Sequence, residues 1–198
     1  MLILASASPR RQELLRNAGI SFTVQPADID EAPLENEAPQ ACAERLAREK
    51  ALAVSESRPQ DYVLGADTIV VVGDAMLGKP RDSDDAIRML RLLSGRAHSV
   101  ITGVCLVSPI AVRSESRQRT ENRELATASA TTMVSMVELS DAEIRDYVAT
   151  GEPIDKAGAY AIQGMASRWI PRIEGDYGNV VGLPVALVYG MLRERGAI

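Results

Sequence analysis

The sequence predicts an α/β protein in which helices flank a mixed central sheet. Apolar runs of strand length alternate along the chain with longer segments whose apolar residues recur at helical spacing. Because the two kinds of segment are interleaved, the pattern favours the α/β class over separate helical and strand regions. The 198 residues fit one domain of ordinary size, so we expect one domain over residues 1–198, although two lobes would also fit.

Turn residues divide the first half of the chain into short elements. Ser8 and Pro9 supply an N-cap and a proline at the first helical position, and Gly19 is placed to end that helix in a left-handed conformation. Gly73 and Asp74 form a turn after an apolar run, which predicts a hairpin. We expect strands over 1–5, 22–24 and 62–72 with a short partner ending near 78, and helices over 9–18, 39–55 and 83–93.

The second half begins with two long strands, which we expect over 98–107 and 126–137. We interpret the polar segment between them, 108–124, as a mobile hairpin loop. Ser140 and Glu143 have the spacing of a capping box and open a short helix that ends at Gly151. Short strands over 160–162 and 169–173 and an amphipathic helix over 184–195 complete the prediction.

Composition argues against several classes of partner. The net charge of −5 disfavours nucleic-acid binding, because neutralising a phosphate backbone requires a basic face. The apolar start of the chain is too short for a signal peptide, and no uncharged run approaches the length of a membrane span. We therefore expect a cytoplasmic protein without nucleic-acid or membrane partners. Cys42 and Cys105 are interpreted as small core residues.

A first candidate site lies at the start of the predicted helix over 9–18. Ser8, Arg10 and Arg11 place a hydroxyl and two guanidinium groups beside the free backbone N–H groups of a helix N-terminus. Two arginines there oppose the helix dipole, so an acidic group should offset them. We interpret the cluster as an anion site; the alternative is that Ser8 only caps and the arginines lie on the surface.

A second candidate is the carboxylate of Asp67, which interrupts the apolar run over 62–72. A carboxylate in such a run lies at a strand end or is partly buried, where it requires a cation or a hydrogen-bond donor. A catalytic role and a structural salt bridge both meet this need. Further acids, Asp28, Asp30 and Glu31, occupy the loop after the strand over 22–24, although acidic loops are common on protein surfaces.

The lysines form a third group of candidates. Lys50, Lys79 and Lys156 are the only lysines in the chain, and each stands beside a glycine, a proline or an apolar helix face. Lys50 falls on the inward stripe of the helix over 39–55, where an anion would stabilise it. Carboxylates together with scattered cations are the equipment of phosphoryl chemistry. With oxygen ligands and a single histidine, His98, the expected metal is magnesium or manganese rather than zinc.

These residues together resemble the Maf family of nucleoside triphosphate pyrophosphatases, and the resemblance spans nearly the whole chain. Neither a P-loop nor a Gly-x-Gly-x-x-Gly motif is present to suggest another nucleotide-binding class. The matching motifs, in order, are Ala5-Ser-Ala-Ser-Pro-Arg-Arg11, Asp30-Glu31, Lys50, Gly65-Ala-Asp-Thr68, Leu77-Gly-Lys-Pro80, Asp155-Lys-Ala-Gly-Ala-Tyr160, Ile162-Gln-Gly164 and Gly175-Asp-Tyr-Gly-Asn-Val-Val-Gly-Leu-Pro184. The segment 108–124 departs from the family by its length and its arginine content.

The resemblance implies a fold similar to the inosine triphosphate pyrophosphatases, with two lobes around a cleft, and a homodimer. It also implies a divalent metal and attack of water on the α-phosphorus. Asp67 matches the family's catalytic acid, as general base or metal ligand, and Glu31 would assist with the metal. The expected contacts to the triphosphate come from Ser8, Arg11, Lys50 and Lys79.

Three further positions, Arg10, Thr68 and Gln163, match those that distinguish the family branch acting on dTTP and UTP. Two alternatives remain: the branch acting on 7-methyl-GTP, and a cell-division regulator that binds a nucleotide without cleaving it. The regulator is disfavoured because binding alone does not require a carboxylate that activates water.

Overall fold

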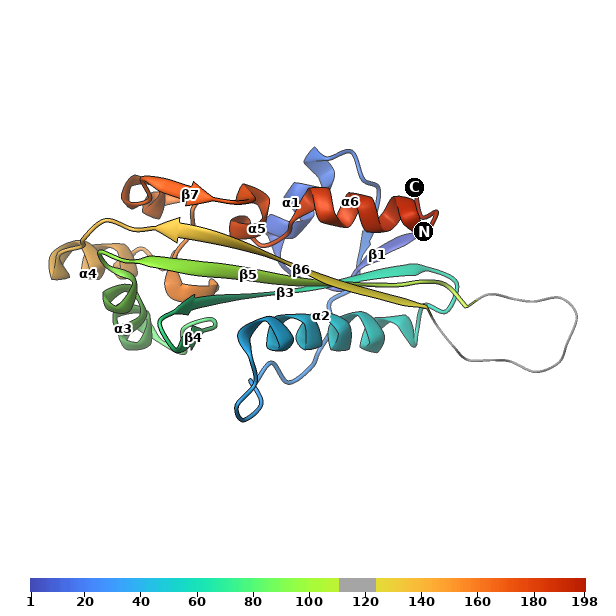
Figure 1. Ribbon diagram of the computed structural model, residues 1–198, viewed down its shortest axis with the longest axis horizontal. Helices are drawn as coiled ribbons and strands as arrows, with labels where there is room; N and C mark the ends of the chain where they lie inside the picture. The colour runs from blue at the N-terminus through green and yellow to red at the C-terminus, as the bar shows by residue number, and fades with distance from the viewer. Residues whose placement is uncertain (111–123) are drawn as a thin grey trace, which may run out of the picture. The chain divides into compact units, whose positions relative to one another are not determined.

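The computed structural model describes residues 1–110 and 124–198 of the chain (Figure 1). Helices and strands alternate along the sequence, as the predicted α/β class requires. In chain order they are β1 (Leu2–Leu4), α1 (Pro9–Asn17), β2 (Thr23–Val24), α2 (Pro39–Ser55), β3 (Tyr62–Val72), β4 (Ala75–Leu77), α3 (Ser83–Leu93), β5 (Ala97–Val107), β6 (Leu125–Ser135), α4 (Asp141–Ala149), the 3₁₀ helices η1 (Ala157–Ala159) and η2 (Met165–Trp169), β7 (Arg172–Glu174), α5 (Tyr177–Val181) and α6 (Val185–Glu194).

The strands form one mixed sheet in the order β2, β1, β3, β5, β6, β7, with β4 paired to β3. β1 runs parallel to both β2 and β3, whereas β4 is antiparallel to β3 and β7 is antiparallel to β6. Parallel neighbours require a crossover connection, and α1 supplies the one between β1 and β2. The prediction of an α/β fold with a mixed central sheet is confirmed.

The chain divides into two compact units whose segments interleave along the sequence. The first unit comprises Met1–Asp67, Gly103–Ser129 and Val185–Ile198, and the second comprises Thr68–Thr102 and Ala130–Pro184. Within β3 the boundary falls between Asp67 and Thr68.

In the first unit, α2 lies unusually close to the strands because two of its contacts are with glycines. A Cβ atom on Gly65 of β3 would stand 2.1 Å from the carbonyl oxygen of Ala47, and one on Gly103 of β5 would stand 2.3 Å from that of Ala43. Neither strand position can therefore carry a side chain while α2 keeps its place. The buried apolar residues around this contact are Ile3, Ala5, Ala47, Ala51, Val54, Val63, Cys105 and Val107.

A larger apolar core fills the second unit. The buried face of α3 presents Ala86, Met89, Leu90 and Leu93 to it, at the spacing expected of an amphipathic helix. From α4, the fully buried Tyr147 packs edge-on against Trp169, with ring centroids 5.2 Å apart. The capping box predicted at the start of α4 is present, because Ser140 and Glu143 each accept from the other's backbone N–H.

Most predicted elements are confirmed, including the bounds of α2, β3 and α3, but residues 160–162 do not form a strand. Gly158 and Ala159 adopt left-handed backbone conformations, with φ of 70° and 59°. The N–H of Ala161 then donates to the phenol oxygen of Tyr147 instead of a neighbouring strand. The apolar run is explained by packing, since Ala159 and Tyr160 belong to the core of the second unit.

The segment after it also differs from the prediction. Trp169 ends η2, and the strand β7 begins only at Arg172. The short helix α5 was not predicted; the side chain of Asp176 caps it by accepting from the N–H of Gly178 at 2.7 Å. Its five residues are too few to show helical periodicity in the sequence.

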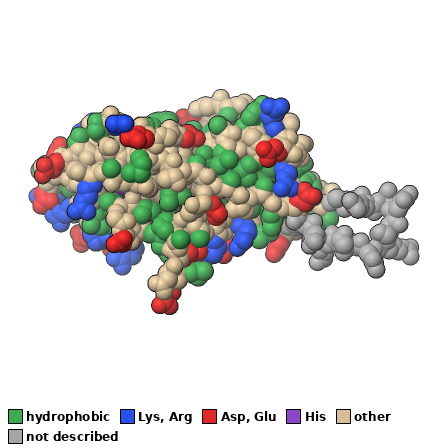
Figure 2. All heavy atoms as spheres, viewed as in Figure 1, with side chains coloured by type: hydrophobic (Ala, Val, Ile, Leu, Met, Phe, Trp, Pro, Cys, Tyr) green, Lys and Arg blue, Asp and Glu red, His purple; other side chains and the backbone are tan. Residues whose placement is uncertain are grey.

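Most of the loop predicted over 108–124 lies outside the described residues, which resume at Glu124. At its two ends, the N–H of Ser108 donates to the carbonyl oxygen of Glu124 at 3.0 Å. Among the described residues, no helix has the length and apolar character of a membrane span. Both cysteines are free and buried, as predicted, and burial raises the pKa of Cys42 to about 11. On the face drawn in Figure 2, acidic and basic side chains both occur among apolar ones.

The close approach of α2 generates a prediction about two glycines. Gly65→Ala should lower the free energy of unfolding by about 1–3 kcal/mol, because the added methyl group must displace the backbone of α2. Gly190→Ala, in α6, is the control: a Cβ there meets no atom within 4 Å, and alanine should raise stability by roughly 0.5–1 kcal/mol. Urea denaturation of both variants measures the effects. Equal stability of the two variants would contradict the proposed packing.

The single histidine generates a second prediction. His98 is 1% exposed in the second unit, and its Nε2 lies 2.8 Å from the hydroxyl of Tyr160. Burial lowers the pKa of His98 to about 4, against a smaller opposing effect of the backbone carbonyl of Arg96, which favours the protonated ring. In the unfolded chain a histidine has a pKa of about 6.5, so between these two pKa values the unfolded state binds a proton that the folded state does not.

The free energy of unfolding should therefore fall as the pH is lowered from about 6.5 to about 4. The contribution of His98 alone to this fall is up to roughly 3 kcal/mol. The check is the free energy of unfolding across this range for the native chain and for His98→Gln, whose difference isolates the histidine from the titrating carboxylates. A difference that does not change with pH would refute this account.

Candidate active site

The candidate anion site at the start of α1 has the predicted local geometry. Ser8 is the N-cap, and its hydroxyl accepts from the N–H of Arg11 at 3.5 Å. The N–H of Ser8 in turn donates to the hydroxyl of Ser6 at 3.2 Å. Pro9 opens the helix, and Arg10, in the first turn, is half-buried. Two hydroxyls and a helix N-terminus are thus gathered at the end of β1.

Arg11 turns inward from this first turn instead of lying on the surface. Its residue exposure is 8%, and its guanidinium group donates to the hydroxyl of Ser6 at 3.1 Å and to the carbonyl oxygen of Ala66 at 2.9 Å. Burial lowers the pKa of Arg11, while the negative charges of Asp67 and Glu31 act in the opposite direction. These two carboxylates are the acidic groups that the sequence led us to expect.

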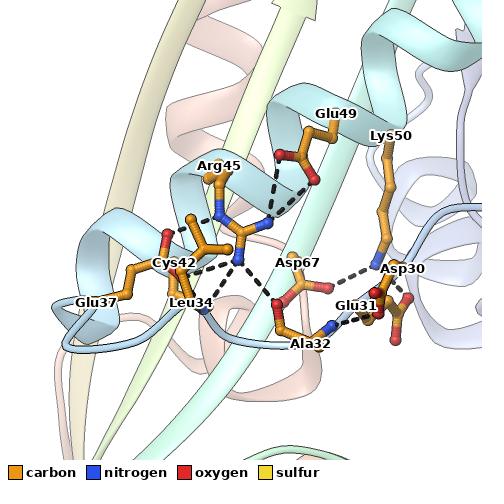
Figure 3. Close-up of polar contacts among 10 residues, drawn as sticks. All are labelled: Asp30, Glu31, Ala32, Leu34, Glu37, Cys42, Arg45, Glu49, Lys50 and Asp67. Atoms are coloured by element: carbon orange, nitrogen blue, oxygen red, sulfur yellow. Dashed lines mark hydrogen bonds and ion pairs between the residues drawn. The ribbon is translucent and has the colours of Figure 1, made fainter.

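Lys50 brings the same two carboxylates together. It lies on the buried face of α2, and its Nζ is 2.6 Å from Oδ1 of Asp67 and 2.6 Å from Oε1 of Glu31 (Figure 3). The side chain of Asp67 is only 12% exposed, whereas that of Glu31 is 42% exposed. The predicted burial of Asp67 and the inward position of Lys50 are both confirmed.

Arg11, Glu31, Lys50 and Asp67 therefore form a charged cluster in the first unit, with two cations facing two carboxylates. Removing a charge from water costs several kcal/mol, so buried charges persist where opposite charges and hydrogen bonds offset that cost. The arrangement satisfies this requirement internally. It also presents, in one place, carboxylates that can accept a proton and cations that can bind phosphate oxygens.

A second network, which the sequence analysis missed, holds the loop that carries Glu31. Arg45 of α2 donates to both carboxylate oxygens of Glu37, at 2.7 and 2.8 Å, and to the carbonyl oxygen of Ala32 at 3.1 Å (Figure 3). Glu49, one turn further along α2, accepts from the same guanidinium group. The hydrogen bond from Arg45 lowers the pKa of Glu37 to about 2, so this brace is intact at neutral pH.

Only the spacing of Arg45 and Glu49, four residues apart on a helix, was a signal for this network in the sequence. The pairing of Arg45 with Glu37 depends on how the loop returns to the helix, which local patterns do not reveal. Gly65 and Gly103 were likewise missed as contacts, although a glycine within an apolar strand is a known sign of close backbone approach.

The carboxylates of Asp67 and Glu31 suit the metal that the sequence suggested. Magnesium is usually held by one or two carboxylates together with phosphate oxygens of the substrate and water. Two carboxylates that approach the same ammonium group can supply such ligands. Within residues 1–110 and 124–198 there is no cluster of three or more histidine, cysteine or acidic side chains able to form an all-protein metal cage.

In the second unit, Thr68 stands at the start of a chain of hydrogen bonds. Its hydroxyl lies 2.9 Å from that of Thr102, which donates to the backbone carbonyl of Asn179 at 3.2 Å. The side-chain amide of Asn179 donates to Thr132 at 2.9 Å and to the carbonyl oxygen of Val100 at 2.9 Å. This buried network ties α5 to β5 and β6, and it explains why α5 forms despite its shortness.

Lys79 and Gln163, also in the second unit, both occupy exposed turns. The turn before Lys79 is anchored by a hydrogen bond from the N–H of Gly158 to the carbonyl oxygen of Gly78, at 3.0 Å. Gln163 lies between η1 and η2, in a turn closed by the N–H of Gly164 and the carbonyl oxygen of Ala161. Both residues are exposed.

Lys156 has a structural role that its sequence motif did not reveal. Its ammonium group donates to the backbone carbonyl of Glu152 at 2.6 Å and to the carboxylate of Asp155 at 2.5 Å. The side chain is 13% exposed. The scarcity of lysine in the sequence therefore indicated that Lys156 is held in a defined position. It did not show whether the partner of Lys156 is a protein group or a phosphate.

Comparison with known proteins shows which family this chain is similar to. The family model for Maf-like proteins matches residues 1–195. A dTTP/UTP pyrophosphatase of Koribacter versatilis is 54% identical over 197 residues, which cover 100% of this chain and 95% of that protein. Proteins of the same name from Syntrophomonas wolfei and from Geobacter sp. strain M21 are 48% and 49% identical, covering 98% and 100% of this chain and 96% of each relative.

Among solved structures, that of the Staphylococcus aureus Ham1 protein is similar with a TM-score of 0.47 and 13% identity, covering 98% of both chains. A likeness at that level carries no argument about the site. The match to the family model over nearly all of the sequence, and identities near one half over whole chains, are decisive by themselves. This chain belongs to the Maf family.

Proposed function

We propose that this protein hydrolyses nucleoside triphosphates, dTTP and UTP in preference to others, to the monophosphate and pyrophosphate. The observation that carries the proposal is the charged cluster, in which the buried carboxylate of Asp67 meets Lys50, Glu31 and Arg11. Relatives about half identical over their whole length are named dTTP/UTP pyrophosphatases, which supports the same substrates here.

The residues of the cluster divide into two chemical roles. Asp67 acts as general base on the water that attacks the α-phosphorus, or it holds the metal that activates that water. Arg11 and Lys50 bind phosphate oxygens, the guanidinium as a planar fork and the ammonium as a point charge. Ser8 and the N-terminus of α1 add hydrogen-bond donors, and Lys79 adds a further cation for the departing pyrophosphate.

We also propose a divalent metal, magnesium or manganese, held by Asp67 and Glu31 together with substrate oxygens. When bound, it would polarise phosphate oxygens and acidify a bound water. Glu31 is suited to exchange its contact with Lys50 for one with the metal, because its side chain is the more exposed of the two carboxylates.

Base recognition is assigned to Arg10, Thr68 and Gln163. Thymine and uracil present two carbonyl acceptors on either side of one N–H donor. The amide of Gln163 accepts from that N–H and donates to one carbonyl, while an arginine, which only donates, suits the other. The exposure of the Gln163 turn is consistent with this role.

Of the two alternatives, a 7-methyl-GTP pyrophosphatase conflicts with the names of the relatives, which specify dTTP and UTP. The regulator that binds without cleaving is disfavoured because binding alone does not require a carboxylate that activates water, such as the buried Asp67. Neither alternative has a specific observation in its favour.

The central test is Asp67→Asn, which keeps the shape of the side chain and removes the basic carboxylate. Turnover of dTTP with magnesium should fall by about two orders of magnitude or more, the usual scale for losing a general base, while nucleotide binding largely survives. Asp74→Asn, in the exposed turn after β3, is the matched control and should keep normal turnover. Pyrophosphate release and equilibrium nucleotide binding measure the two effects, and near-normal turnover by Asp67→Asn would remove the basis of the assignment.

The assignment of the base contacts predicts an order of substrates. The dTTP and UTP specificity constants should be highest, those of CTP lower because an amino group replaces a carbonyl, and those of GTP and 7-methyl-GTP lowest. Each buried polar group left unpaired should cost roughly 1–3 kcal/mol of discrimination. Gln163→Ala should reduce these differences. The assignment is wrong if 7-methyl-GTP is the best substrate or if Gln163→Ala leaves the order and the ratios unchanged.

A further inference from the structure

The turn that carries Gln163 is held by hydrogen bonds on both sides of that residue. On one side, the N–H of Ala161 donates to the phenol oxygen of Tyr147 at 3.1 Å. On the other, the N–H of Met165 donates to Oε1 of Glu152 at 3.1 Å and to Oε2 at 3.3 Å. Gln163 is thus flanked by two backbone anchors, neither of which involves its own side chain.

The two anchors are joined to each other. The hydroxyl of Tyr147 donates to Oε1 of Glu152 at 2.7 Å, so Ala161, Tyr147, Glu152 and Met165 form one continuous chain of hydrogen bonds. Burial, followed by the hydrogen bond to Glu152, raises the pKa of Tyr147, which keeps its hydroxyl protonated as a donor. The same Oε1 atom accepts from both Tyr147 and Met165, and an uncharged amide oxygen could do the same.

Rigid neighbours surround this chain of bonds. The ring of Tyr147 is fully buried against Trp169. Glu152 is fixed at its backbone by Lys156, whose ammonium donates to its carbonyl oxygen at 2.6 Å. A Cβ on Gly164 would stand 2.2 Å from Oε1 of Glu152, so the carboxylate lies directly against the backbone of the turn.

We propose that Tyr147 and Glu152 are positioning residues for substrate specificity, which fix the turn over 161–165 so that the amide of Gln163 keeps one orientation toward the base. The proposal rests on the assignment of Gln163 to base recognition. It deepens that assignment because a terminal amide discriminates between bases only if its oxygen and nitrogen are held in register with them.

A purely structural role for the two residues makes a different prediction. If they only stabilise the second unit, their loss lowers the melting temperature and affects all nucleotides alike at temperatures where the protein is folded. If they position Gln163, their loss reduces the ratio between good and poor substrates. The ratio of specificity constants for dTTP and GTP therefore separates the two roles.

The experiment compares Glu152→Ala, Glu152→Gln, Tyr147→Phe and the control Asp146→Ala, an exposed carboxylate beside Tyr147 on α4. Specificity constants for dTTP, UTP, CTP and GTP are measured with magnesium, well below each melting temperature. In Glu152→Ala the ratio of the specificity constants for dTTP and GTP should fall by about tenfold or more, which is the loss expected when a group that contacts the substrate is slightly misplaced. Tyr147→Phe should lower the ratio less, Glu152→Gln should keep most of it, and Asp146→Ala should not change it.

The double variant Glu152→Ala with Gln163→Ala completes the test. If Glu152 acts through Gln163, the double variant should discriminate no worse than Gln163→Ala alone, so the two effects are not additive. Additive effects, or unchanged ratios in folded Glu152→Ala and Tyr147→Phe, would overturn the proposal. If Gln163→Ala itself leaves the ratio unchanged, the base assignment under the proposed function fails, which is a separate and recognisable result.

Discussion

The pairing of a buried lysine with two carboxylates is the interaction on which the candidate site depends. Asp67 is tolerated inside an apolar strand because Lys50 meets it at 2.6 Å, and Lys50 is tolerated on a buried helix face because Asp67 and Glu31 receive it. The pairing in turn requires α2 to lie close to β3, which the absence of a side chain at Gly65 allows. The electrostatics of the site and the backbone packing beneath it are therefore one constraint.

The sequence predicts much of this arrangement wherever the signal is local. Periodicity places Lys50 inward and the apolar run over 62–72 buries Asp67, and both inferences are confirmed. The helices with clear caps, at Ser8 and Ser140, begin where predicted. Each of these features depends on residues within one or two turns of each other, which is the range over which propensity and periodicity act.

What the sequence does not predict depends on contacts between distant segments. The brace between Arg45 and Glu37 needs the path of a loop, and the chain of bonds from Tyr147 through Glu152 needs a turn that periodicity misassigned as a strand. Apolar residues at 160–162 are equally compatible with a strand and with an irregular turn packed on a core, and only the left-handed backbone at Gly158 and Ala159 decides between them. The resemblance to the family indicated Gln163 as a candidate base contact, but it did not indicate the groups that hold its turn.

The interleaving of the two units has a consequence for how the chain folds. The first unit, which contains Asp67, also includes α6, and the hydroxyl of Tyr62 at the start of β3 donates to the carbonyl oxygen of Arg195 at 2.7 Å. During synthesis, the unit that carries the charged cluster therefore remains incomplete until α6 has left the ribosome. Contacts between residues so far apart in the sequence close slowly because of the entropy of the intervening loop. Completion of the unit that carries Asp67 is consequently coupled to the arrival of α6.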